Sequence, residues 1–132
     1  EICPSDTYHI ARYAILLCYL GEPDKALLEI ERAMRIDPFC SDLVLEAQGL
    51  CFYVLKKFKD VVTSFKKMQI DTRNSLFYHA SSLQELGEKE KAINTLNIAL
   101  NESGMSIEKF ISTQLFKDKD TLQTLKLSLN SI

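Results

Sequence analysis

The sequence has 132 residues, of which 46% are hydrophobic and 26% charged, the balance of one ordinary globular domain large enough to bury a core. Its 18 acidic and 16 basic residues leave a net charge of −2, so no overall field attracts nucleic acid or an anionic membrane surface. No apolar run approaches the roughly 20 residues of a membrane-spanning helix, and we expect neither a membrane segment nor a nucleic-acid partner.

Residues that commonly hold metals or perform catalysis are scattered. The chain contains four cysteines and two histidines: Cys3, Cys18, Cys40, Cys51, His9 and His79. They form no Cys-x-x-Cys pair and no zinc-type spacing, and the chain has no Gly-rich phosphate loop. We therefore expect no metal, no cofactor and no enzyme activity. Cys18 and Cys51 fall inside apolar stretches, where a free thiol behaves as a small hydrophobe, and this favours a reducing, cytoplasmic compartment.

Apolar residues recur every three or four positions along most of the chain, and no segment sustains the alternation of a strand. This spacing predicts an all-α fold. In chain order, the expected helices cover residues 7–20, 24–36, about 42–55, 58–70, 76–86 and 89–101, then a seventh from a cap at Ser106 through Leu115 and an eighth beginning at Asp118 or Asp120. Gly21-Glu22-Pro23-Asp24 forms the first turn, and Asp37-Pro38 ends the second helix because Pro cannot continue it.

The stretch from Leu20 to Pro38 recurs from Leu86 to Gly104, 66 positions later. The equivalent positions are Gly21 and Gly87, Ala26 and Ala92, Ile30 and Leu96, and Ala33 and Ala99. The middle hairpin fits between them when Gly49 is aligned with Ala14 and Ala80, and Val61 with Ala26 and Ala92. A fixed period indicates stacked helical hairpins, in which small residues let helix backbones approach closely.

These residues resemble the tetratricopeptide repeat, whose pattern places A-x3-F and a closing Pro on the second helix. The pattern appears as Ala26-x3-Ile30, Val61-x3-Phe65 and Ala92-x3-Leu96. It departs from the family at the tryptophan position, which holds Ile10, Leu45 and Leu76. The resemblance implies an α-solenoid: three repeats within residues 1–104 (about 7–40, 41–74 and 75–104), then a capping helix pair over residues 105–132.

The resemblance also implies a non-catalytic protein-interaction scaffold, whose first helices line a concave groove for a protein or peptide segment. The groove positions are Tyr8, Ala11, Ile15, Cys18 and Tyr19 in the first repeat, Leu43, Glu46, Leu50, Tyr53 and Val54 in the second, and Asn74, Phe77, Ser81, Gln84 and Glu85 in the third. The aromatic residues among them could instead pack internally, and Cys18 and Val54 are better core candidates. The Lys, Arg and Asn that members use to clamp carboxylates are missing, which favours an apolar or mixed partner segment.

A finer resemblance concerns GEPDKALLEIERAMRIDP, FYHASSLQELGEKEKA and the ending SIEKF…LFKDKDTLQTLKLSL. These phrases are similar to bacterial tails that follow class III adenylate or guanylate cyclase domains or winged-helix regulators. They imply the C-terminal regulatory part of a larger signalling protein. The alternative is a free-standing chaperone of the type III secretion class, whose third repeat can look like FYHASSLQELGE. The sequence leaves a homo-oligomer open.

Overall fold

The computed structural model describes residues 5–39 and 41–132, and these form eight α-helices. The helices are α1 (Ser5–Tyr19), α2 (Pro23–Ile36), α3 (Asp42–Val54), α4 (Phe58–Lys66), α5 (Arg73–Glu85), α6 (Lys89–Ser103), α7 (Ile107–Ser112) and α8 (Lys119–Asn130). The described residues contain no strand, and the predicted all-α class is confirmed.

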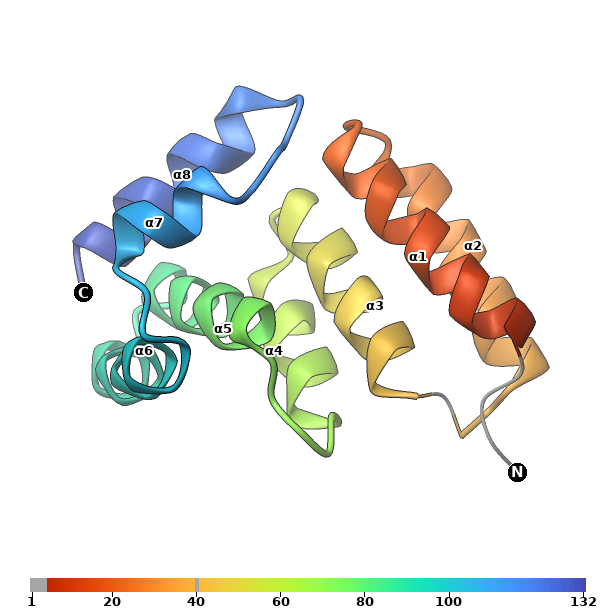
Figure 1. Ribbon diagram of the computed structural model, residues 1–132, viewed down its shortest axis with the longest axis horizontal. Helices are drawn as coiled ribbons and strands as arrows, with labels where there is room; N and C mark the ends of the chain where they lie inside the picture. The colour runs from red at the N-terminus through yellow and green to blue at the C-terminus, as the bar shows by residue number, and fades with distance from the viewer. Residues whose placement is uncertain (1–4, 40) are drawn as a thin grey trace.

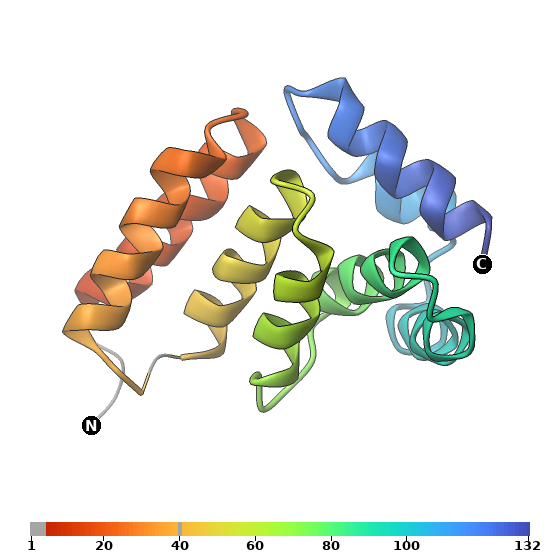
Figure 2. The ribbon, with the colours of Figure 1, turned by 180° about the vertical axis from the view of Figure 1, so that it is seen from behind.

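The helices pack as successive pairs. α1 packs on α2, α3 on α4 and α5 on α6, and α3 also contacts α1 and α2 while α5 contacts α4. In Figure 1, α1 and α3 lie in front of α2 and α4, and Figure 2 shows the reverse face with α2 and α4 forward. The last pair turns back: α8 packs on α5, and the loop between α7 and α8 reaches towards the end of α1 (Figure 1).

One turn geometry joins the two helices of each of the first three pairs. Gly21 ends α1 at φ +80°, and the Glu22 amide donates to the Leu17 carbonyl at 2.9 Å. Gly87 repeats this geometry at φ +81° after α5. In the middle pair Lys56 takes the same place at φ +61°, a left-handed conformation that side chains other than Gly adopt at a cost. The 66-residue repeat of the sequence is therefore also a repeat of backbone conformation.

The small residues of the repeat lie where helices approach one another. Ala26, Ala92 and Ala99 are fully buried. A Cβ added at Gly49 on α3 would lie 2.2 Å from Cε1 of Phe65 on α4, so no larger residue fits there without movement of the ring. Close packing of small against large residues thus sets the distance between α3 and α4.

Three predicted helix boundaries are wrong. α4 ends at Lys66 rather than residue 70, because the Asp42 carboxylate accepts the Gln69 and Ile70 amides at 3.0 and 2.9 Å and holds this segment as a turn. α5 begins three residues early, where Thr72 caps it and Ser75 completes a capping box. α7 ends at Ser112, which leaves Leu115 79% exposed instead of packed on the helix face.

Candidate functional site

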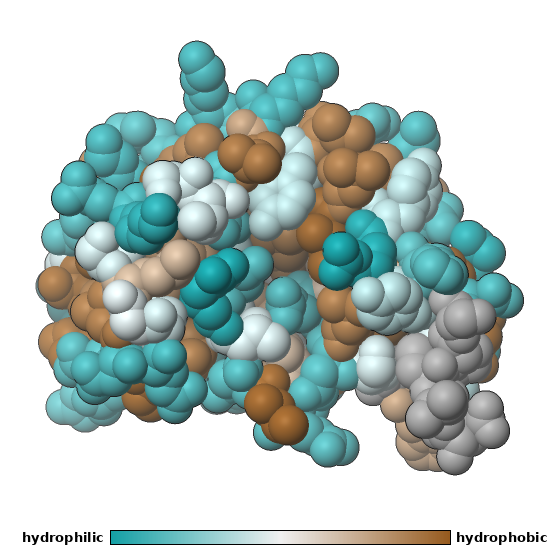
Figure 3. Space-filling view, in the orientation of Figure 1, coloured by the Kyte–Doolittle hydropathy of each residue, from teal (hydrophilic) through white to brown (hydrophobic). Residues whose placement is uncertain are grey.

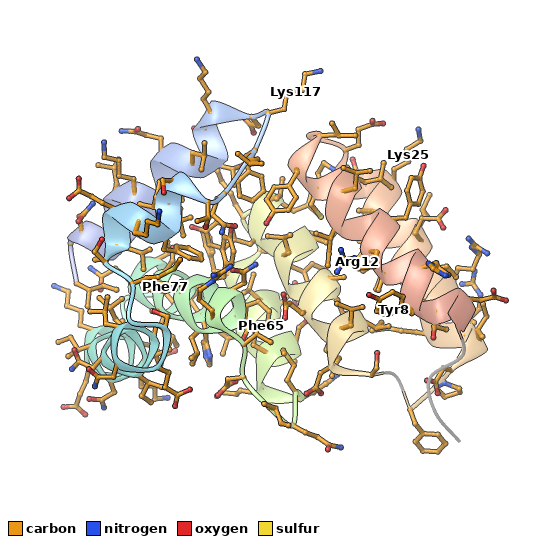
Figure 4. All side chains as sticks on the ribbon, in the orientation of Figure 1. Tyr8, Arg12, Lys25, Phe65, Phe77 and Lys117 are labelled. Carbon is orange, nitrogen blue, oxygen red and sulfur yellow. The ribbon has the colours of Figure 1, made fainter. Side chains whose placement is uncertain are left out.

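A pocket of about 340 Å³ lies where α1, α3 and α5 converge. Six residues predicted for the groove by position line it: Ile15, Tyr19, Leu43, Glu46, Leu50 and Asn74. Four residues that the sequence did not assign to the groove also line it: Arg12, Leu16, Phe65 and Tyr78. Figure 4 labels two of the lining residues, Arg12 and Phe65, and Figure 3 shows hydrophobic residues beside hydrophilic ones around the middle of this face.

The polar groups of the pocket lining are one carboxylate, one amide, two tyrosine hydroxyls and one guanidinium. Glu46 on α3 accepts a hydrogen bond from the Thr72 hydroxyl at 2.8 Å and forms no ion pair with any described residue. The Oδ1 of Asn74 on α5 is buried without a hydrogen-bond partner among the described residues. Burial, and next the Glu46 carboxylate, raise the pKa of Tyr19 above its usual value of 10.0. The positive charge of Arg73 opposes this rise. The pocket therefore combines apolar walls with one carboxylate, that of Glu46, and has cations nearby.

Arg12 is the cation that lines the pocket, and it also contacts the Tyr8 ring. Its guanidinium carbon lies 5.9 Å from the centre of the Tyr8 ring, a cation–π arrangement. Tyr8 itself, predicted for the groove, is 47% exposed on α1 beside Arg12 but does not line the pocket. The helical phase of Tyr8, Ile15 and Tyr19 places Arg12 on the same face, so the sequence contained the signal for it.

The other half of the predicted groove lies beneath α7 and α8. Tyr53, Phe77 and Ser81 are almost completely buried, so they are not available at the surface of this structure. Phe77 stacks on Phe110 of α7 with ring centres 4.1 Å apart, as the internal-packing alternative expects. The Ser81 hydroxyl shares hydrogen bonds with Tyr53, at 2.7 Å, and with Ser128 of α8.

The remaining groove positions are also accounted for. The Gln84 amide donates to the Ser131 carbonyl at 3.4 Å, next to the end of α8. Ala11 and Cys18 on α1 are fully buried, and Val54 on α3 is partly buried. Glu85 is exposed at the end of α5. The structure therefore brings the pocket residues together and separates them from the half-groove that the last helix pair covers.

The segment that follows α7 connects the last helix pair to α1 and α5 by hydrogen bonds. Oε1 of Gln114 accepts hydrogen bonds from the hydroxyls of Tyr19, at 3.0 Å, and Tyr78, at 2.6 Å. The Lys117 amide donates to the Tyr19 carbonyl at 2.7 Å, and the Phe116 ring lies 4.7 Å from the Tyr19 ring. No periodic pattern in the sequence marks Gln114, because its partners lie 36 and 95 positions away.

Residues 5–39 and 41–132 hold no group of three or more His, Cys, Asp or Glu placed to bind a metal ion. No helix in those ranges is long and apolar enough to cross a membrane. A scan against protein-family models, a search of curated proteins and a search of solved structures each found no significant match. The tetratricopeptide resemblance therefore stays a prediction from the sequence.

Proposed function

We propose that this chain is a non-catalytic protein-interaction module, a tetratricopeptide-like solenoid of three hairpins with a C-terminal helix pair. Its partner is a polypeptide segment that binds at the pocket between α1, α3 and α5. The observation that carries this proposal is the lining of that pocket by the first helix of every hairpin. Concave sites of about this volume, with mostly apolar walls and a few polar groups, are the usual binding sites of proteins.

The apolar walls of the pocket continue onto the surface. Leu16 lines the pocket and is still 52% exposed, and Ile15 and Leu43 are only partly buried. Apolar groups grouped around a concavity gain free energy when a partner covers them. A short extended or helical segment is the kind of partner that fits such a surface.

The resemblance to the tails of bacterial cyclases and regulators supports a proposal about the larger protein in which the module works. We propose that it serves as the C-terminal regulatory part of a larger bacterial signalling protein, such as a nucleotide cyclase or a transcriptional regulator. The buried free thiols of Cys18 and Cys51 are in keeping with the reducing cytoplasm in which such proteins work. The reading frame of the full gene tests this part: a frame that encodes these residues alone would refute it.

The binding proposal is tested with a randomised peptide library displayed on phage. Peptides are selected on the wild-type protein and then measured against two variants, Leu16→Arg at the pocket and Leu28→Arg on α2, where Leu28 is 65% exposed and outside the pocket. We expect the peptides to lose binding to Leu16→Arg and to retain it on Leu28→Arg. Equal binding to both variants, or a selection that yields no peptide, would refute the proposal.

A further inference from the structure

We propose that the pocket receives a basic side chain, lysine or arginine, from the partner polypeptide. This inference rests on the proposed function and specifies the chemistry of its site. The pocket volume of about 340 Å³ is at the small end of ligand sites, which suits one long side chain better than a packed element.

The first argument is the unbalanced charge of Glu46. It is the acidic residue of the pocket lining, it is partly buried, and no Lys or Arg of the described chain pairs with it. The neutral hydroxyl of Thr72 is its hydrogen-bond donor. A half-buried carboxylate gains more from a cation than an exposed one does, because water screens the pair less.

The second argument is the orphan acceptor of Asn74. Its Oδ1 is buried and receives no hydrogen bond from the described residues, and Asn74 lines the same pocket as Glu46. A buried acceptor without a donor destabilises the free protein. Because this oxygen is closed to solvent, a ligand donor reaches it only when the Asn74 side chain turns towards the pocket, and that turn gives the oxygen its missing hydrogen bond. Lysine offers three N–H donors and arginine five, and neither presents an acceptor that would meet these oxygens.

The walls suit the rest of such a side chain. Ile15, Leu43, Leu50 and Phe65 are apolar, and a lysine or arginine packs its methylene stem on apolar surface while its charged head reaches a polar group. An acidic ligand fits less well. It would face the Glu46 carboxylate, and Arg12, which could attract it, lies over the Tyr8 ring.

The peptides selected on the wild-type protein also test this inference. We expect them to share a lysine or arginine, and its replacement by norleucine, an uncharged analogue, to weaken binding about tenfold or more. Glu46→Gln keeps an acceptor for Thr72 and should bind the lysine and norleucine peptides almost equally. Glu31→Gln, which removes the same charge from an exposed position on α2, should behave as the wild type.

The outcomes separate this inference from the proposed function. Peptides that need the pocket, by their loss on Leu16→Arg, but that lack a basic residue or prefer an acidic one would overturn the inference and leave the proposed function intact. A norleucine peptide that binds the wild-type protein as well as the lysine peptide does would also overturn the inference and leave the proposed function intact. This comparison uses the wild-type protein alone, so it does not depend on whether a variant folds. Failure to find any pocket-dependent peptide would overturn both.

Discussion

Gly49→Ala tests the contact that sets the spacing between α3 and α4. The added methyl group would lie 2.2, 2.6 and 2.8 Å from Cε1, Cζ and Cδ1 of Phe65, all far inside van der Waals contact. Phe65 is 2% exposed, so its ring cannot move out into solvent without a rearrangement of its neighbours. The open direction is the pocket, which Phe65 lines.

The magnitude follows from two opposing effects. Overpacking a core costs about 1–3 kcal/mol, whereas Ala in place of Gly inside a helix gains about 1 kcal/mol. We therefore expect Gly49→Ala to lower the free energy of unfolding by about 0–2 kcal/mol, measured by urea denaturation and far-UV circular dichroism. Because the displaced ring enters the pocket, peptide binding should fall even if stability changes little.

A double-mutant cycle isolates the contact from the helix-propensity gain. Phe65→Leu removes the ring edge and alone costs less than the roughly 3–5 kcal/mol of a Phe→Ala change. The double variant Gly49→Ala/Phe65→Leu should be more stable than the sum of the single changes by at least about 1 kcal/mol. Additivity within about 0.5 kcal/mol would refute the close approach of these two positions.

Four further changes probe other parts of the fold. Ala92→Leu overpacks a fully buried position and should cost about 1–3 kcal/mol, seen as a lower melting temperature; an unchanged value would contradict the stacked-hairpin packing. Lys56→Gly relieves a positive φ and should raise the melting temperature, although it removes an exposed ion pair. Gln114→Leu leaves the buried Tyr78 hydroxyl without its acceptor and should cost about 1–3 kcal/mol, most of which Tyr78→Phe restores. Burial lowers the pKa of His79 below 6.5, so its contribution to stability is present above that pH and lost as the pH falls; His79→Gln should flatten this acid limb in urea titrations.

Local chemistry made the helix pairs predictable. Gly21 and Gly87 end their helices in the left-handed conformation that a glycine after an apolar helix predicts. The periodic spacing of apolar residues located every helix within a few residues of its observed bounds. The turn at Lys56 is less obvious, since no glycine marks it, and its place followed from the apolar spacing of the helices on either side.

Long-range contacts decided what local patterns left open. Asp42 holds the amides of Gln69 and Ile70, 27 and 28 positions later, and so ends α4 before its apolar pattern ends. The start of α5 was readable in principle, because Thr72 and Ser75 have the spacing of a capping box. A side chain that bonds across such distances in sequence has no periodic signature.

The extent of the groove shows most clearly what the sequence pattern could and could not predict. A repeat pattern predicts which helix faces are concave, and Ile15, Glu46 and Asn74 do meet in one pocket. It cannot predict that α7 and α8 fold back over Tyr53 and Phe77, because that direction depends on tertiary contacts made by residues after the last repeat.

The nature of that cover limits where a partner can bind. Phe110 and Leu125 are fully buried, and Leu129 is 1% exposed, so removing the pair would expose a large apolar surface. It would also break the hydrogen bonds that Gln114 accepts from two tyrosine hydroxyls. Displacement by a partner would have to offset both losses, whereas the pocket beside Glu46 is accessible without any change in the fold. We therefore expect the proposed peptide to be selected by the few groups of that pocket, of which the Glu46 carboxylate is the one acid.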